Sequence, residues 1–158
     1  HVMLLLDRAA ESALAVDRQI PVNAEKLALA LAESWPRLRR QVSFVNSDIE
    51  AVAVKADDLV VSSHACGELT DLIIDKAVAV RARVAVLPCC HDAETCQSLG
   101  LEKWMDVSLA IDAARVFRLQ SAGYQVTAQT IPSTITPKNR LIIAQPGDHH
   151  GEPDREQE

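Results

Sequence analysis

The sequence has few aromatic residues and no long apolar run. Aromatic side chains make up 3% of the chain, which argues against a base-stacking surface of the kind that binds single-stranded nucleic acid. No apolar run approaches the roughly 18–20 residues that span a bilayer, and no signal peptide opens the chain. We therefore expect a soluble, cytoplasmic protein without a membrane partner.

Glycine, cysteine and net charge are also limited. The chain has five glycines and no string resembling G-x-G-x-x-G. Its four cysteines are too few for a disulfide-rich scaffold of this length, and Cys89 and Cys90 are adjacent, so we expect reduced thiols. The net charge is -6, and most of it lies in residues 147–158. The body of the chain therefore has no strong field that recruits nucleic acid.

The sequence does contain an alternation of helical and strand-like patterns. The expected helices cover residues 1–11, 23–35, 68–80 and the stretch from residue 107 to Gly123. The expected strands cover residues 13–20, 41–46, 57–63, 83–87, 125–131 and 140–144, and the runs at 57–63 and 83–87 are expected to be buried on both faces. This pattern favours an α/β domain over residues 1–146, mostly parallel with an antiparallel C-terminal edge. Residues 147–158 are expected to form a disordered acidic tail.

Polar residues follow four of the expected strands. Asp17 and Asp48 follow the first two, and residues 63–67 (SHACG) and 88–92 (PCCHD) follow the next two. Ligands of open α/β sheets bind outside the carboxyl ends of the strands, and two carboxylates there suit ribose hydroxyls and an adenine amino group. An adenosine site is one interpretation. A turn-forming or helix-capping role for each aspartate is the other.

The most specific signal is a string of His, Cys, Gly, Thr and Asp after the third expected strand. Residues 62–92 read SSHACGELTDLIIDKAVAVRARVAVLPCCHD. This string resembles the H-x-C-G-x-x-T-D-L and C-C segments of a class I S-adenosylmethionine-dependent methyltransferase family. The family includes tRNA acceptor-stem ribose 2'-O-methyltransferases and the methyltransferase domain of glutathione S-transferase C-terminal domain-containing protein. The resemblance covers most of the chain and implies a Rossmann-like sheet.

The resemblance also implies a cofactor, a substrate and a set of site residues. The cofactor is S-adenosylmethionine, and the implied substrate is RNA, through a tRNA ribose hydroxyl. The implied cofactor-binding residues are Asp17 and Arg18, with Asp17 on the ribose, Asp48 and Ile49 flanking the adenine, and Ser63 and His64 at the methyl-transfer cleft. The implied catalytic residues are His64, Cys66 and His91. A histidine is suited to accept the proton of the hydroxyl nucleophile.

The sequence departs from this family at its start. The family's first strand and its glycine-rich cofactor loop would lie immediately before His1 and are absent from the 158 residues. We therefore expect the domain to be incomplete at its N-terminus. A complementing N-terminal segment or a homo-oligomer is then the expected partner.

Other functions remain open at this point. A non-catalytic binding or scaffold module of the same fold is one. A zinc-binding domain is another, because His64, Cys66, Cys89, Cys90, His91 and Cys96 are zinc-ligand types. Their spacing argues against zinc, since adjacent cysteines are hard to point at one ion and small buried cysteines are common in cores. We therefore assign no metal ligand. A nucleophilic cysteine paired with a histidine is a further alternative.

Overall fold

The computed structural model describes Leu4 and residues 10–147. The chain divides into two compact units, His1–Ala53 and Val54–Glu158. The first is the N-terminal unit and the second is the C-terminal unit. Each has a sheet of its own.

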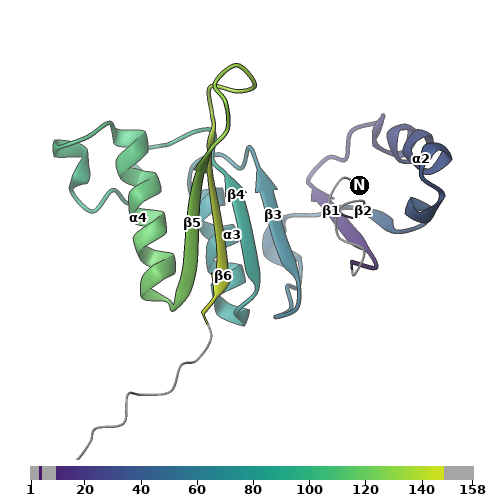
Figure 1. The fold of residues 1–158 in the computed structure, drawn as a ribbon, viewed down its shortest axis with the longest axis horizontal. Helices are drawn as coiled ribbons and strands as arrows, with labels where there is room; N and C mark the ends of the chain where they lie inside the picture. The colour runs from purple at the N-terminus through teal and green to yellow at the C-terminus, as the bar shows by residue number, and fades with distance from the viewer. Residues whose placement is uncertain (1–3, 5–9, 148–158) are drawn as a thin grey trace, which may run out of the picture. The chain divides into compact units, whose positions relative to one another are not determined.

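The N-terminal unit is a pair of parallel strands connected through a helix (Figure 1). Its elements are β1 (Ala13–Asp17), α2 (Ala24–Ser34), the 3-10 turn η1 (Pro36–Leu38), β2 (Val42–Asn46) and the 3-10 turn η2 (Ile49–Ala51). The register places Asp17 opposite Asn46, at the carboxyl ends of both strands. This is the strand, helix, strand order that parallel pairing requires.

The C-terminal unit is built on a four-stranded sheet with the order β3-β4-β6-β5. Its elements are β3 (Leu59–Ser63), α3 (Glu68–Val80), β4 (Arg83–Leu87), the 3-10 turn η3 (Leu101–Lys103), α4 (Val107–Ser121), β5 (Tyr124–Thr130) and β6 (Arg140–Pro146). β3 and β4 are parallel, whereas β6 runs antiparallel to β4 and to β5. The expected antiparallel pair at the C-terminal edge is confirmed, and β6 is its inner strand.

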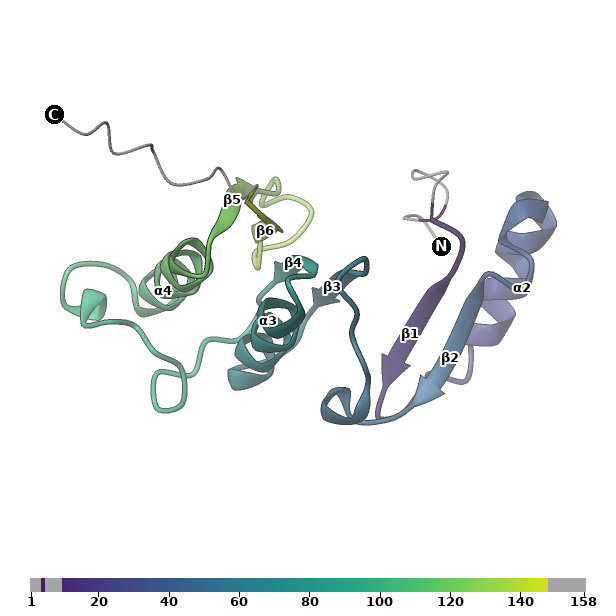
Figure 2. The ribbon, with the colours of Figure 1, turned by 90° about the horizontal axis from the view of Figure 1, so that it is seen from below.

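The core of the C-terminal unit lies between one face of this sheet and two helices. α3 and α4 lie on the same side of the sheet (Figure 2). The strand register puts Val84 of β4 and Ala144 of β6 on that side, and both are buried. The helices contribute buried Ile73, Ile74, Ala77, Ala110, Ile111, Ala114 and Leu119. Tyr124 of β5 donates to the Ala77 carbonyl at 3.2 Å and the Ala82 carbonyl at 3.0 Å, which fixes the end of α3 against the sheet.

The opposite face of this sheet is open within the described residues. Val61 of β3 is 55% exposed, and its register partner Ala85 of β4 is half-buried. The prediction that residues 57–63 form a strand buried on both faces is therefore wrong. α3 and α4 cover one face only, so β3 alternates between more and less exposed residues.

Two of the expected helices expose apolar residues that recur at helical spacing. α2 has no buried residue, and Leu27 is 58% exposed. In α4, Phe117 is largely exposed, whereas Asp112 and Arg115 are buried. Apolar periodicity could not show this polar part of the α4 core, because it counts only apolar side chains.

Other expected elements are confirmed. α3 and β4 have the expected bounds, and α4 ends before Gly123, which has a positive φ of 79°. The expected helix over residues 1–11 and the expected tail over residues 147–158 fall almost entirely outside the described residues. In the part of the chain that is described, no helix is long and apolar enough to cross a membrane.

The buried core of α3 gives a direct test of this packing. Ile74→Ala is expected to lower the free energy of unfolding by about 2–5 kcal/mol, because Ile74 is fully buried and its loss leaves a cavity. Leu69→Ala, on the same helix at a position that is 39% exposed, is the control and should cost clearly less. Urea denaturation of both variants measures the difference, and equal losses would contradict the placement of the core.

Candidate functional site

The carboxyl ends of β1 and β2 gather four of the sequence-predicted residues in the N-terminal unit. Asp17 ends β1, and Arg18 forms an exposed ion pair with Asp48. Ile49 opens η2 directly after Asp48. The Asp17 carboxylate accepts the Gln19 backbone N–H at 2.9 Å, so the turn-forming role is present, and it occupies one oxygen of a group that accepts several hydrogen bonds.

An open groove of about 590 Å³ also lies in the N-terminal unit. Residues of α2 and β2 line it, among them Ala28, Leu29, Val42 and Phe44. None of its lining residues is a sequence-predicted site residue. The groove and the carboxylates at the strand ends are therefore separate features.

In the C-terminal unit, the loops after β3 and β4 are held side by side by backbone hydrogen bonds. The His64 N–H donates to the Leu87 carbonyl at 3.2 Å, and the Gly67 N–H donates to the Cys90 carbonyl at 3.1 Å. His64 has a φ of 62°, in the left-handed region that non-glycine residues rarely adopt. This turn leaves Ser63, His64 and Cys66 exposed.

Three cysteine sulfurs meet where these two loops touch. The Cys66 and Cys89 Sγ atoms are 3.4 Å apart, and the Cys89 and Cys90 Sγ atoms are 3.6 Å apart. All three sulfurs lie within 4.8 Å of one another. The expectation that adjacent cysteines are hard to point at one ion is wrong here, because the Cys89 and Cys90 sulfurs both lie within 4.8 Å of the Cys66 sulfur.

The pKa values of two of these thiols are shifted in opposite directions. Hydrogen bonding first to Cys90 and then to Cys89, together with burial, raises the pKa of the Cys66 thiol to about 12. Hydrogen bonding first to Cys66 and then to Cys89, with a smaller contribution from the charge of Lys138, lowers the pKa of Cys90. Of these two thiols, Cys90 therefore ionises more readily than Cys66.

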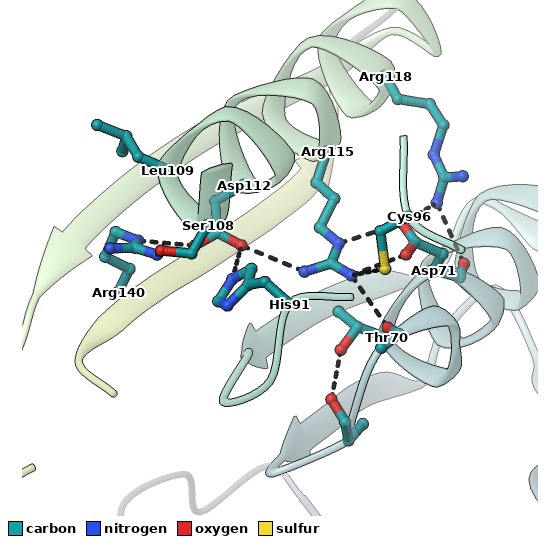
Figure 3. A network of polar contacts seen from close by, with 12 residues as sticks. Thr70, Asp71, His91, Cys96, Ser108, Leu109, Asp112, Arg115, Arg118 and Arg140 are labelled. Atoms are coloured by element: carbon teal, nitrogen blue, oxygen red, sulfur yellow. Dashed lines mark hydrogen bonds and ion pairs between the residues drawn. The ribbon is translucent and has the colours of Figure 1, made fainter. Parts of the chain in front are cut away.

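A buried carboxylate lies at the centre of a polar network beneath these loops (Figure 3). Asp112 of α4 accepts from His91 Nε2 at 2.8 Å and from Arg115 Nη1 at 3.2 Å on one oxygen. Its other oxygen accepts from Arg140 Nε at 2.7 Å. The side chains of His91, Asp112 and Arg115 are 5%, 6% and 2% exposed, so these three are almost fully removed from water, whereas Arg140 is 36% exposed.

Arg115 connects the network to the loop after β3. It donates to the Gly67 carbonyl at 3.0 Å and to both Asp71 oxygens, at 3.1 Å and 2.7 Å. Burial alone lowers the pKa of Arg115, but hydrogen bonding to Asp71 and the charges of Asp71 and Asp112 outweigh it, so the pKa is raised. Arg115 therefore stays charged. Thr70 completes the frame by donating to the Ala65 carbonyl at 2.6 Å.

Arg140 reaches this network because β6 is reversed. An antiparallel strand brings its amino end to the edge of the sheet where its neighbour has its carboxyl end, and β6 pairs Ile142 with Val86 near the end of β4. Arg140, the first residue of β6, then bonds Asp112 and the Ser108 hydroxyl, the latter at 2.9 Å. The C-terminal edge of the sheet thus contributes directly to the site.

The structure brings the predicted residues together in two groups. Asp17, Arg18, Asp48 and Ile49 belong to the N-terminal unit, and Ser63, His64, Cys66 and His91 belong to the C-terminal unit. Sequence reasoning missed Asp112, Arg115 and Arg140. For Asp112 and Arg115 the sequence does contain a signal, because these two charged residues, three positions apart, interrupt the apolar pattern of an expected helix.

Both groups of residues lie within the part of the chain that matches a known protein family. Residues 4–96 match the model of a family described as a methyltransferase domain. The chain belongs to this methyltransferase family. The match includes all eight residues of the two groups and stops before Asp112, so the α4 part of the network lies beyond it. No curated protein gives a significant match to the chain.

The buried carboxylate can be tested by removing it. Asp112→Ala is expected to lower the free energy of unfolding by about 3–5 kcal/mol, because Arg115 is left buried with one partner fewer. The control is Asp75→Ala, since Asp75 is 61% exposed and its ion pair with Arg118 lies at the surface; it should cost less than about 1 kcal/mol. Thermal or urea unfolding compares the two, and a loss at Asp112 no larger than at Asp75 would show that the network does not frame the unit.

Proposed function

We propose that this chain is the core of an S-adenosylmethionine-dependent methyltransferase. The family match over residues 4–96 is the observation that carries the proposal, because that span contains the polar residues at the ends of β1, β2, β3 and β4. The strand orders β1-β2 and β3-β4-β6-β5 support a Rossmann-like sheet of the class I type.

In this proposal, the N-terminal unit binds the adenosine part of the cofactor. Asp17 accepts hydrogen bonds from the ribose hydroxyls, through the oxygen that the turn leaves available. Asp48 and Ile49 flank the adenine, and the Arg18 ion pair holds the Asp48 carboxylate in place. The cofactor supplies the reactive methyl group when it is bound.

The loop after β3 has the chemistry to receive the methyl acceptor. Methyl transfer from a sulfonium is an in-line displacement, so the protein gains most of its rate from aligning the acceptor and excluding water. Ser63, His64 and Cys66 are exposed on this loop. The His64 ring is available to accept the proton of a hydroxyl nucleophile. His91 is buried against Asp112, so we assign it a positioning role for the loop after β4.

The proposed acceptor is RNA, through a ribose hydroxyl of tRNA. The resemblance of residues 62–92 to the ribose 2'-O-methyltransferases supports this choice. Arg83 and Lys138 of the C-terminal unit provide positive charge for phosphate contacts.

The open strand edges support the proposal of a complementing strand. Among the described residues, β1 pairs only with β2, and β3 pairs only with β4. Unpaired edges are templates for strand addition. An N-terminal segment, or the same segment of a second copy, is the proposed source of that strand and of the cofactor loop.

The ribose contact is testable by binding. Asp17→Asn is expected to weaken S-adenosylmethionine affinity at least about fivefold, the scale of a hydrogen bond to a charged group. Asp57→Asn removes an exposed charge before β3 and is the control. Calorimetry on this chain and on a version extended upstream along its reading frame measures both. Unchanged affinity for Asp17→Asn rules out the ribose contact, and no binding by either version supports a non-catalytic scaffold.

The proton acceptor is testable by turnover. His64→Asn is expected to lower the rate of methyl transfer about a hundredfold or more while leaving cofactor affinity within about twofold, because a general base acts on the acceptor. The assay follows a labelled methyl group from S-adenosylmethionine into tRNA, and nucleoside digestion locates it. Label on a base instead of a ribose would reject the proposed acceptor, and a fully active variant would remove His64 from the reaction.

A further inference from the structure

The three-cysteine cluster is the feature that the proposed function does not use. Methyl transfer to a hydroxyl needs one proton acceptor and good alignment, and it gives no reason for three sulfurs at one point. Cys66, Cys89 and Cys90 nevertheless have all three Sγ atoms within 4.8 Å of one another. All three are free thiols.

The sulfur positions match the spacing of a metal site. A zinc ion binds thiolate sulfur at about 2.3 Å, so two thiolates of a tetrahedral site are roughly 3.8 Å apart. The closest pairs here are 3.4 Å and 3.6 Å apart. Two of the three sulfur pairs are therefore close to the tetrahedral spacing, and the third pair lies within 4.8 Å.

The backbone holds the cluster in this arrangement before any ion binds. The hydrogen bonds from His64 to Leu87 and from Gly67 to Cys90 join the two loops on either side of the sulfurs. Arg115 donates a hydrogen bond to the Gly67 carbonyl and so holds the loop after β3 in place. A site whose ligands are already gathered loses less conformational entropy on binding than one that forms with the ion.

Burial defines the open side of the cluster. Cys89 is buried, whereas Cys66 and Cys90 are exposed, so the sulfurs face solvent on one side. The nearby Cys96 and His91 are engaged elsewhere, since Arg115 donates to the Cys96 sulfur at 3.6 Å and the His91 ring bonds Asp112. The candidate ligand set is therefore three cysteines, and His91 and Cys96 of the earlier Cys/His hypothesis lie outside it.

The local charge suits a cation held by thiolates. Three thiolates with a divalent ion carry one net negative charge. The amino end of α3, which begins at Glu68 two residues after Cys66, presents the positive end of a helix dipole, and the charge of Lys138 acts on Cys90. Soft sulfur ligands select zinc over magnesium and calcium, which prefer oxygen.

We propose that Cys66, Cys89 and Cys90 bind one Zn²⁺ ion through three thiolates, with a fourth position open to solvent. Each thiol releases its proton as it binds, so uptake weakens as the pH falls. The open position takes water or another small ligand. Cys66 shares the loop after β3 with the proposed acceptor site, but metal uptake is measured on the chain without cofactor or acceptor, so its outcome does not depend on methyl transfer.

Metal uptake by the reduced chain tests this site. Zn²⁺ is added to the whole chain under a non-thiol reductant, and bound metal is measured after gel filtration. One equivalent per chain is expected. Cys90→Ser is expected to weaken binding at least about tenfold, and because Cys90 is exposed this variant should fold. Cys89→Ser is the buried counterpart, and Cys96→Ser is the matched control that should retain full uptake.

A second readout distinguishes the site from chance binding and from oxidation. Co²⁺ in place of zinc is expected to give the absorption of a tetrahedral ion with thiolate charge-transfer bands, lost in Cys90→Ser and kept in Cys96→Ser. Absence of stoichiometric uptake by the reduced wild-type chain would overturn the proposal. Equal loss in Cys96→Ser would do so too.

Discussion

The buried carboxylate of Asp112 is the interaction on which the C-terminal unit's site depends. It joins His91 from the loop after β4, Arg115 from its own helix and Arg140 from the start of β6. Taking such groups out of water is costly, and well-packed apolar residues often give equal or greater stability. What the ion network adds is a defined geometry, because Arg115 and Arg140 each bind acceptors from different parts of the unit at once. Through Arg115 and Asp71 it extends to Gly67, so one charge cluster sets the position of both loops.

The motif H-x-C-G-x-x-T-D acquires a physical meaning from this arrangement. Thr70 and Asp71 do not face the exposed surface of the loop. Thr70 holds the Ala65 carbonyl, and Asp71 binds the guanidinium that holds Gly67. His64 and Cys66, in contrast, are exposed. The motif therefore contains residues that present chemistry and residues that hold the backbone in place, and only the first kind is available to a substrate or an ion.

Sequence reasoning recovered the elements and the strand ends but not the network between them. The bounds of α3 and β4 follow from local pattern, since Leu and Ile spacing and Pro88 are visible along the chain. Asp112, Arg115 and Arg140 meet across positions 112 to 140, and no local pattern records which charged residues will pair. The adjacency of Cys89 and Cys90 misled for a related reason, because spacing along the chain does not give side-chain direction in an irregular loop. The prediction of β3 as buried on both faces failed because a continuous apolar run does not show how many layers cover it.

The separation between a buried frame and an exposed set of reactive groups has a consequence for how this protein can change over evolutionary time. The side chains of His64, Cys66 and Cys90 are exposed and lie outside the buried Asp112 network. Replacing them therefore changes the free energy of unfolding little. Substitutions at Asp112 or Arg115 remove contacts that hold both the loop after β3 and the loop after β4. Descendants of this domain can therefore diverge in what they bind or modify while inheriting the same scaffold, and the loops after β3 and β4 are where such divergence would first be seen.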